Sequence, residues 1–118
     1  MTYIPRQGDI ITIDFNPTKG HEQHGRRPAV VVSNASYNSF ARGVALVCPI
    51  TNTDRNIPIQ PRLDDRTKTS GVIMTDQVKA LDLTKRDAVF VEILPFDILI
   101  ETCDIVSGFS EIESICDN

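Results

Sequence analysis

The chain has 118 residues, 41% of them hydrophobic, which fits one domain with one hydrophobic core. No apolar run approaches the roughly 18 residues that cross a bilayer, and the N-terminus lacks the basic and apolar regions of a secretory signal. The three cysteines are widely spaced and fit reduced thiols better than disulfides or a zinc site. We therefore expect residues 1–118 to form a single cytoplasmic domain without membrane segment, metal or cofactor.

The net charge of −4 is divided unevenly along the chain. Residues 1–62 contain seven Lys/Arg and four Asp/Glu, a net of +3, and residues 63–118 contain five and twelve, a net of −7. The total charge argues against a nucleic-acid partner. The asymmetry, however, is compatible with an anionic ligand on one face and an acidic surface on the other.

The elements predicted in chain order are mostly short strands. Residues 9–15 alternate, with Ile11, Ile13 and Phe15 on one side and polar residues on the other, which is the pattern of a half-buried strand. Further apolar or β-branched runs lie at residues 28–33, 43–50, 71–75 and 88–94, with a shorter, proline-restricted candidate at 57–60. Close spacing without helical crossovers predicts a mainly β fold, an antiparallel sheet curled into a small barrel.

Two segments are predicted to be helical. Residues 33–40 have Ser33 or Asn34 available as N-cap. Residues 95–108 begin with a proline and end at Gly108, a natural stop. We expect this second helix to cap the open end of the barrel.

The predicted helix 95–108 has two distinct faces. Its apolar side chains recur at helical spacing, at Phe96, Leu99, Cys103 and Val106. Its acidic side chains form the opposite, solvent-facing stripe, at Asp97, Glu101 and Asp104.

The segment 16–27 is long for a hairpin connection, and long ordered loops are usually functional. It concentrates polar side chains at Lys19, His21, Glu22, Gln23, His24, Arg26 and Arg27. The alternative interpretation is a solvated loop whose charges only confer solubility.

Arg27 stands directly before Pro28 and a buried strand, so its backbone is anchored while its guanidinium can reach the sheet rim. An arginine held in this way suits bidentate recognition of phosphate. Two further rim elements are Thr51, at the end of the apolar run 43–50, and residues 76–79 (DQVK).

The chain resembles the MazF/PemK-type toxin endoribonucleases of bacterial toxin–antitoxin systems. The match is carried by residues 8–33 (GDIITIDFNPTKGHEQHGRRPAVVVS), 37–38 (YN), 48–51 (CPIT) and 70–82 (SGVIMTDQVKALD). The resemblance implies a small SH3-like (CcdB/PemK-type) antiparallel β-barrel with short helices and a C-terminal helix. It also implies a homodimer that cleaves single-stranded RNA, such as mRNA, without a metal ion.

The same resemblance implies catalytic roles for three residues. In metal-free cleavage the ribose 2′-OH attacks the adjacent phosphorus and leaves 2′,3′-cyclic phosphate and 5′-OH ends. Arg27 matches the family's catalytic arginine and would stabilise the phosphorane charge, and Thr51 matches its catalytic threonine. Glu22 matches the glutamate of the family's EQ pair, and it could serve as the base or read a base edge.

Substrate-binding roles are expected for polar residues of the loop and the rim. These are Lys19, His21, Gln23, Arg26, Thr53, Asp76, Gln77 and Lys79. His21 and His24 also allow a histidine-pair mechanism, although the family pattern ties neither to catalysis. Base stacking would be provided by Phe15, Tyr37 or Phe40, because the chain contains no tryptophan.

The expected partners are single-stranded RNA, a second copy of the chain, and a cognate MazE/PemI-like antitoxin whose disordered acidic tail would occupy the RNA groove. DNA would be contacted only indirectly, through the antitoxin. One rival hypothesis is a CcdB-like inhibitor of DNA gyrase on the same fold, which acts through a terminal tryptophan motif that this chain lacks. A second rival is an inactive barrel that serves as an interaction module.

Overall fold

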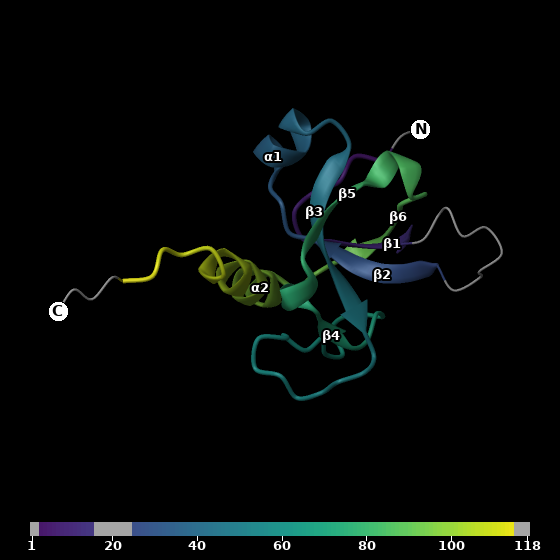
Figure 1. Ribbon diagram of the computed structural model, residues 1–118. Helices are drawn as coiled ribbons and strands as arrows, with labels where there is room; N and C mark the ends of the chain where they lie inside the picture. The colour runs from purple at the N-terminus through teal and green to yellow at the C-terminus, as the bar shows by residue number, and fades with distance from the viewer. Residues whose placement is uncertain (1–2, 16–24, 115–118) are drawn as a thin grey trace.

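The computed structural model describes residues 3–15 and 25–114. Its strands are β1 (Asp9–Asp14), β2 (Arg26–Val31), β3 (Val44–Thr51), β4 (Val72–Ile73), β5 (Lys79–Asp82) and β6 (Val89–Ile93). The helices are α1 (Ala35–Phe40) and α2 (Phe96–Gly108), with two 3₁₀ turns, η2 (Thr75–Gln77) and η3 (Leu83–Lys85). In Figure 1 both helices lie to the left of the sheet's long strand β3, with α1 above α2.

The strands form one antiparallel sheet in the order β4-β3-β2-β1-β6, and β5 pairs with the first half of β3. The antiparallel β fold with a C-terminal helix is therefore confirmed. The sheet does not close into a barrel, because among the described strands β4 pairs only with β3 and β6 only with β1. The β3 strand is consequently the longest and most connected element of the sheet.

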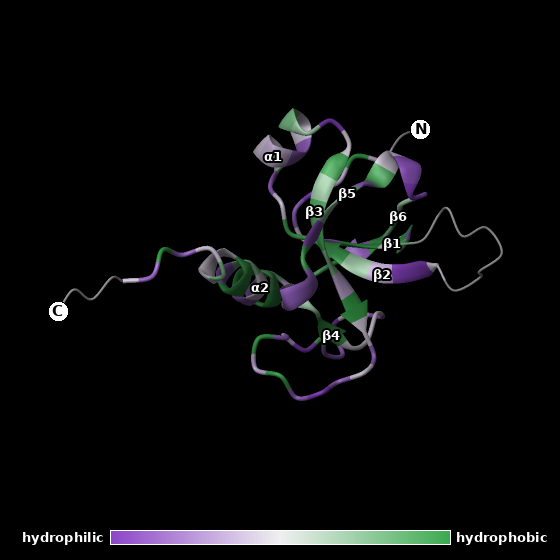
Figure 2. Cartoon of the chain, viewed as in Figure 1, coloured by the Kyte–Doolittle hydropathy of each residue, from purple (hydrophilic) through white to green (hydrophobic). Residues whose placement is uncertain are grey.

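Two apolar clusters lie on the two faces of the sheet. Ile10 belongs to the cluster that also contains Ile98 of α2, whereas Ile11 and Ile13 belong to the cluster on the other face. The prediction of a half-buried strand at residues 9–15 is thus wrong for its first half, where Ile10 and Ile11 are both fully buried. The reason is that β1 lies between β2 and β6 and has an apolar cluster on each face. Figure 2 shows the corresponding green colour along β1, the end of β3 and α2.

Helix α2 follows Pro95 and ends at Gly108, as predicted. Its buried side chains are Ile98 and Thr102, and Leu99, Cys103 and Val106 pack beside them against the sheet. Phe96 was expected on this face but is 71% exposed, because the stripe that meets the sheet leaves it at the margin. The three acidic residues of the opposite face are exposed, as predicted. The helix covers a face of the sheet instead of capping a barrel end (Figure 1).

Helix α1 confirms the N-cap prediction, since the Asn34 side chain accepts a hydrogen bond from the backbone N–H of Tyr37 at 3.0 Å.

The predicted strand at 57–60 is absent. These residues form a turn in which the N–H of Gln60 donates to the carbonyl of Ile57 at 3.0 Å. The prolines in this segment have no N–H for a strand ladder.

The predicted strand at 71–75 is shorter than expected, and η2 follows it. Strand β5 was not predicted, because Lys79, Ala80 and Asp82 are weak strand formers. Pairing with β3 over Val44–Val47 overrides that weak propensity. Within the described residues, no helix is long and apolar enough to cross a membrane.

Candidate active site

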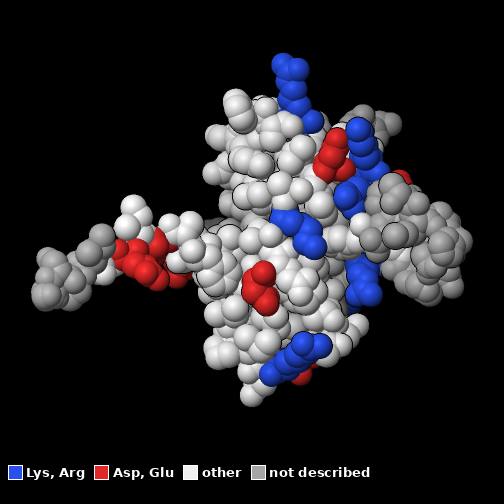
Figure 3. Space-filling view, viewed as in Figure 1, with Lys and Arg blue, Asp and Glu red and all other residues white. Residues whose placement is uncertain are grey.

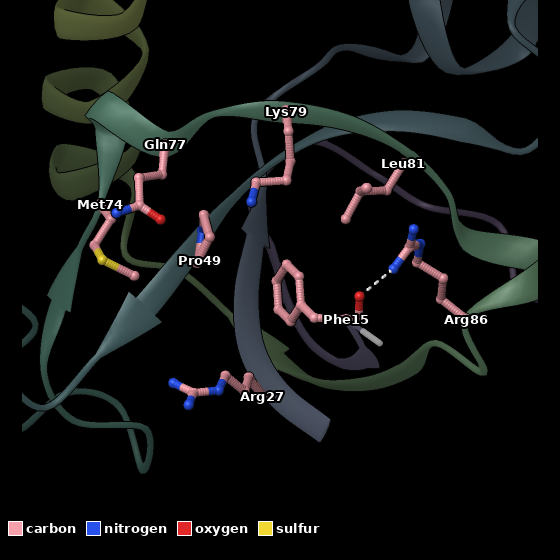
Figure 4. A pocket seen from close by; sticks show the side chains of 8 residues that line it. All are labelled: Phe15, Arg27, Pro49, Met74, Gln77, Lys79, Leu81 and Arg86. Carbon is pink, nitrogen blue, oxygen red and sulfur yellow. Dashed lines mark hydrogen bonds between the residues drawn. The ribbon is translucent and has the colours of Figure 1, made fainter. Parts of the chain in front are cut away.

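Two adjoining cavities lie at the C-terminal end of β3. The larger has a volume of about 460 Å³ and is lined by Phe15, Arg27, Pro49, Met74, Gln77, Lys79, Leu81 and Arg86. The smaller, of about 180 Å³, is lined by Thr51, Thr53, Arg55, Ile57, Gln60, Met74, Asp76 and Gln77. Because Met74 and Gln77 border both, the cavities form one depression, which we call the β3 groove. Figure 4 shows its larger part, with side chains from several strands pointing into it.

The strand register explains why Arg27 and Thr51 meet at the β3 groove. Strands β2 and β3 pair Val31 with Val47 and Ala29 with Pro49. Two residues further along each strand, Arg27 and Thr51 fall on this same face, because side chains alternate with a period of two, and they line the larger and the smaller cavity respectively. Two residues that are 24 positions apart in the sequence are thereby brought to one site.

Arg26 and Arg27 are neighbours in β2 but have different surroundings. The Arg26 guanidinium donates to Thr12 Oγ1 at 2.8 Å and forms an ion pair with Asp87 at 3.1 Å. The exposed Arg27 side chain makes no hydrogen bond or ion pair within the described part of the chain. Its guanidinium points toward the Met74 end of the cavity in Figure 4. Arg27 is therefore available to an anionic ligand, whereas Arg26 is held by β1 and Asp87.

The far end of the larger cavity is built around Phe15. The Arg86 guanidinium donates to the Phe15 carbonyl at 2.7 Å and to the Asp14 carbonyl at 3.2 Å. The Lys79 ammonium lies 5.6 Å from the centroid of the Phe15 ring, within the range of a cation–π contact. Phe15 thus contacts two cations of the same cavity, Lys79 over its ring and Arg86 at its backbone carbonyl (Figure 4).

The larger cavity carries a concentrated positive charge. Its described lining includes three cations, Arg27, Lys79 and Arg86, and no carboxylate. Figure 3 shows basic side chains spread over this face with some acidic ones among them, and a further group of acidic side chains on the segment after α2. An acidic protein therefore has a local cluster of positive charge, so its net charge does not argue against an anionic ligand at this cavity.

Thr51 lies at the wall of the smaller cavity. Its hydroxyl oxygen accepts a hydrogen bond from the N–H of Thr53 at 3.1 Å, so its own proton remains free to be donated to a ligand. The wall requires Gly71, which has a φ of +120° and passes so close that an added Cβ would lie 2.2 Å from the Thr51 carbonyl oxygen. Only glycine allows β4 to reach β3 at this point.

The predicted rim segment 76–79 is also part of the β3 groove. The Thr75 hydroxyl donates to the Ile59 carbonyl, which anchors η2 to the preceding loop. Asp76 accepts a hydrogen bond from the Gln60 amide at 3.0 Å, and Gln77 projects between the two cavities. The four predicted binding residues of the rim therefore line one groove. They are Thr53, Asp76, Gln77 and Lys79.

Some predicted residues are not placed in the β3 groove. Lys19, His21, Glu22, Gln23 and His24 lie outside the described residues. Tyr37 and Phe40, two of the three stacking candidates, belong to α1 before the first residue of β3. Neither residue lines a cavity of the groove. Phe15 is thus the stacking candidate that the structure places in the groove.

Arg55, Met74 and Arg86 were missed by sequence reasoning. Arg86 lies just before the apolar run 88–94, and its position across from β1 is a consequence of sheet pairing that the local pattern does not contain. Arg55 lies in a loop without periodicity, so the only signal was its charge. Among residues 3–15 and 25–114, no group of three or more His, Cys, Asp or Glu side chains could hold a metal ion.

The family model described as "PemK-like, MazF-like toxin of type II toxin-antitoxin system" matches residues 6–106. The chain belongs to this family. The endoribonuclease toxin MazF of Escherichia coli K12 is 42% identical over 86 residues, 73% of this chain and 76% of that protein. Endoribonuclease PemK of Escherichia coli is 33% identical over 99 residues, 80% of this chain and 74% of PemK.

Solved structures of MazF proteins share the fold. A crystal structure of MazF from Deinococcus radiodurans superimposes with a TM-score of 0.79 at 34% identity, covering 92% of this chain and 97% of that one. A MazE–MazF crystal structure from the same organism gives a TM-score of 0.80 at 28% identity and covers 95% and 100%. The predicted MazF/PemK family and fold are therefore confirmed.

Proposed function

We propose that this chain is the endoribonuclease toxin of a type II toxin–antitoxin system, and that it cleaves single-stranded RNA in the β3 groove. The observation that carries the proposal is that Arg27 and Thr51, from two strands, line the two adjoining cavities of one groove, whose larger cavity has three cations and no carboxylate in its described lining. Membership of the toxin family and the endoribonuclease relatives support the same activity.

The reaction we propose is an internal transesterification. The ribose 2′-oxygen forms a bond to phosphorus and loses its proton to a base, the P–O5′ bond breaks, and the 5′-oxygen takes up a proton. The products are a 2′,3′-cyclic phosphate and a 5′-OH end. Arg27 stabilises the charge on the non-bridging oxygens, and the Thr51 hydroxyl donates a hydrogen bond to one of them.

Glu22 is the residue we propose for the proton transfer or for reading a base edge, on the strength of its match to the family motif. The guanidinium of Arg27 is a poor proton donor, because an arginine side chain is not deprotonated in proteins. Charge stabilisation is therefore its role, and the proposed mechanism needs no metal ion.

We further propose that RNA is held by the polar and cationic residues around this centre. These are Thr53, Asp76, Gln77 and Lys79 of the described rim, together with Lys19, His21 and Gln23. Arg26, which lies outside the groove lining, would contact RNA only by exchanging its exposed ion pair with Asp87 for a phosphate. Phe15, with Lys79 over its ring, supplies a stacking surface for one base.

Incubation of the purified protein with a long single-stranded RNA in EDTA tests this function. We expect defined fragments with 5′-OH ends, and sequencing those ends identifies the cut site. Intact RNA at equimolar protein would contradict the proposal and favour a binding poison or an inactive module. Cleavage that appears only when Mg²⁺ is restored would contradict the metal-free mechanism.

A homodimer is the assembly we propose, formed through an apolar surface on β6 and α2. Exposed apolar side chains on these two elements are Val89, Phe90, Val91, Ile93, Phe96 and Ile100. Strand β6 is an edge strand, and an exposed apolar edge is a site for pairing with another chain. Light scattering should show a dimer that Ile93→Lys converts to a monomer.

The remaining partner is an antitoxin of the MazE/PemI type, in line with MazE–MazF structures of the relatives. An acidic, disordered tail of such a protein fits the cationic β3 groove, and DNA would be contacted only through that antitoxin. Within this proposal residues 1–118 act as one toxin domain in the cytoplasm.

A further inference from the structure

We infer that Arg55 binds an RNA phosphate neighbouring the one that Arg27 and Thr51 act on, and that Arg62 positions it. This inference rests on the proposed function, since it assigns a further contact to the same substrate. Neither the family motifs nor the binding residues expected from the sequence include Arg55 or Arg62.

Arg55 has the position and the chemistry for such a contact. It lines the smaller cavity together with Thr51, and its side chain is exposed. Within the described residues its guanidinium forms no hydrogen bond or ion pair. The nearby carboxylate of Asp76 instead accepts from the Gln60 amide. A guanidinium that is charged at every pH and has unused donors is suited to bidentate binding of phosphate.

The backbone on both sides of Arg55 is fixed by side chains. Asp54 Oδ1 accepts a hydrogen bond from the Asn56 N–H at 2.7 Å, which closes a short turn with Arg55 at its apex. Asn56 has a φ of 57°, a left-handed conformation that asparagine tolerates better than most residues. The turn therefore holds Arg55 pointing out from the loop.

Arg62 locks this turn from the side of the sheet. Its Nε donates to Asp54 Oδ2 and its Nη2 donates to Asn56 Oδ1, both at 2.6 Å. Arg62 is itself bridged to Val72 of β4, so the lock is anchored to the sheet. The hydrogen bond from Arg62 lowers the pKa of Asp54, because it stabilises the charged carboxylate. Arg62 uses its donors on the protein, and it is accordingly a positioning residue.

If Arg55 binds phosphate and Arg62 positions it through Asp54, the effect of Asp54→Ala on RNA binding is the opposite of what charge alone predicts. Asp54→Ala removes a negative charge beside an RNA groove, so charge alone predicts tighter RNA binding. Loss of the turn predicts weaker binding, because Arg55 then pays more conformational entropy to reach the phosphate. Asp65→Ala is the matched control, since Asp65 is an exposed acid of the same loop with no hydrogen bond or ion pair within the described residues.

The experiment is a titration of the full chain with an uncleavable 2′-deoxy analogue of its RNA substrate, at several salt concentrations. Arg55→Gln should reduce the log–log salt slope by about 0.7, which corresponds to an affinity loss of about fivefold at 0.1 M salt. Arg55→Lys should retain the slope, because the charge remains. Asp54→Ala should bind more weakly than the Asp65→Ala control. Asn56→Gly, which keeps the left-handed backbone but loses the acceptor, should fall between the wild type and Asp54→Ala.

Three outcomes would overturn the inference. Arg55→Gln with unchanged affinity and slope would remove Arg55 from the site. A loss of affinity with an unchanged slope would assign Arg55 to base reading instead of phosphate. Asp54→Ala that binds more tightly than the control would show that charge, and not positioning, governs this loop. Because binding is measured on an uncleavable analogue, a wild type that fails to cut RNA would count against the proposed function and leave these binding results to stand on their own.

Discussion

Polar side chains near the two ends of β3 differ in burial and in hydrogen bonding. At the first end Ser33 Oγ accepts from the N–H of Leu46 at 2.9 Å and donates to Asn38 Oδ1, and the Asn38 amide donates to the carbonyls of Pro5 and Ser33. Both side chains are buried and fully partnered. At the last end Arg27 and Arg55 are exposed and lack such partners within the described chain.

This difference separates polar groups that stabilise the fold from those kept for a ligand. Buried polar groups must be paired, because an unpaired one costs about 1–3 kcal/mol. A binding residue instead keeps its donors unpaired and retains solvent contact until the ligand arrives. Substitutions at the first end should therefore change stability, and substitutions at the last end should change catalysis.

The largest effect should come from the groove end. Arg27→Gln removes the proposed charge stabiliser, and loss of one preorganised donor typically lowers the rate by about 10²–10³-fold. The control is Arg42→Gln, which removes the same charge at the first end of β3, where residue 42 lies outside the groove lining. Single-turnover cleavage of an RNA oligonucleotide measures both. A folded Arg27→Gln enzyme with full activity would remove Arg27 from the mechanism.

Thr51 should show a smaller loss that depends on its hydroxyl. Thr51→Val keeps the branched shape but removes the donor, and a hydrogen bond to a charged group is worth about 1.5–3 kcal/mol, or about 10–150-fold in rate. Thr51→Ser should retain most of the activity. Rates for the three proteins at saturating RNA provide the test, and equal rates for Val and Thr would show that the hydroxyl is not used.

At the first end of β3, Asn38→Ala should destabilise the protein by about 1–3 kcal/mol, because it leaves the Pro5 and Ser33 carbonyls without their donor. Urea denaturation measures this loss. The rate of the folded fraction should match that of the wild type. A large rate loss in fully folded protein would show that the two ends of β3 are coupled.

The smallest effect concerns the ion pairs that tie the loop after β3 to α2. Arg66 binds Asp64 and Asp97, each at 2.8 Å, and this contact lowers the pKa of Asp64 to about 2 from its ordinary 3.8. A carboxylate with a depressed folded pKa adds stability above its unfolded pKa and loses it as the pH falls toward the folded value. The melting temperature should therefore decline slightly between about pH 4 and pH 2. Arg66→Gln should remove this part of the decline, and high salt should weaken it.

The local sequence pattern determined most of the secondary structure. Alternation predicted β1, and apolar runs predicted β2, β3 and β6. Helix signals predicted the start of α2 to within one residue and its last residue, Gly108, correctly. These elements are encoded by neighbours within a few residues of one another, so a period and a cap suffice to find them. The family motifs likewise singled out Arg27 and Thr51 without reference to the fold.

Long-range pairing decided the rest. Strand β5 exists because β3 offers it an edge, Ile10 is buried because α2 covers its face, and Phe96 is exposed because the contact stripe of α2 bypasses it. Arg26 and Arg27 have different surroundings because the Arg26 side chain contacts Thr12 of β1, whereas the Arg27 side chain lines the groove. Arg55 is positioned at the groove by the hydrogen bonds between Arg62 and its neighbour Asp54. Arg86 lines the groove because it hydrogen-bonds to the backbone at the end of β1. Each of these features depends on residues distant in sequence, and a local pattern contains no information about which distant surface a side chain will meet.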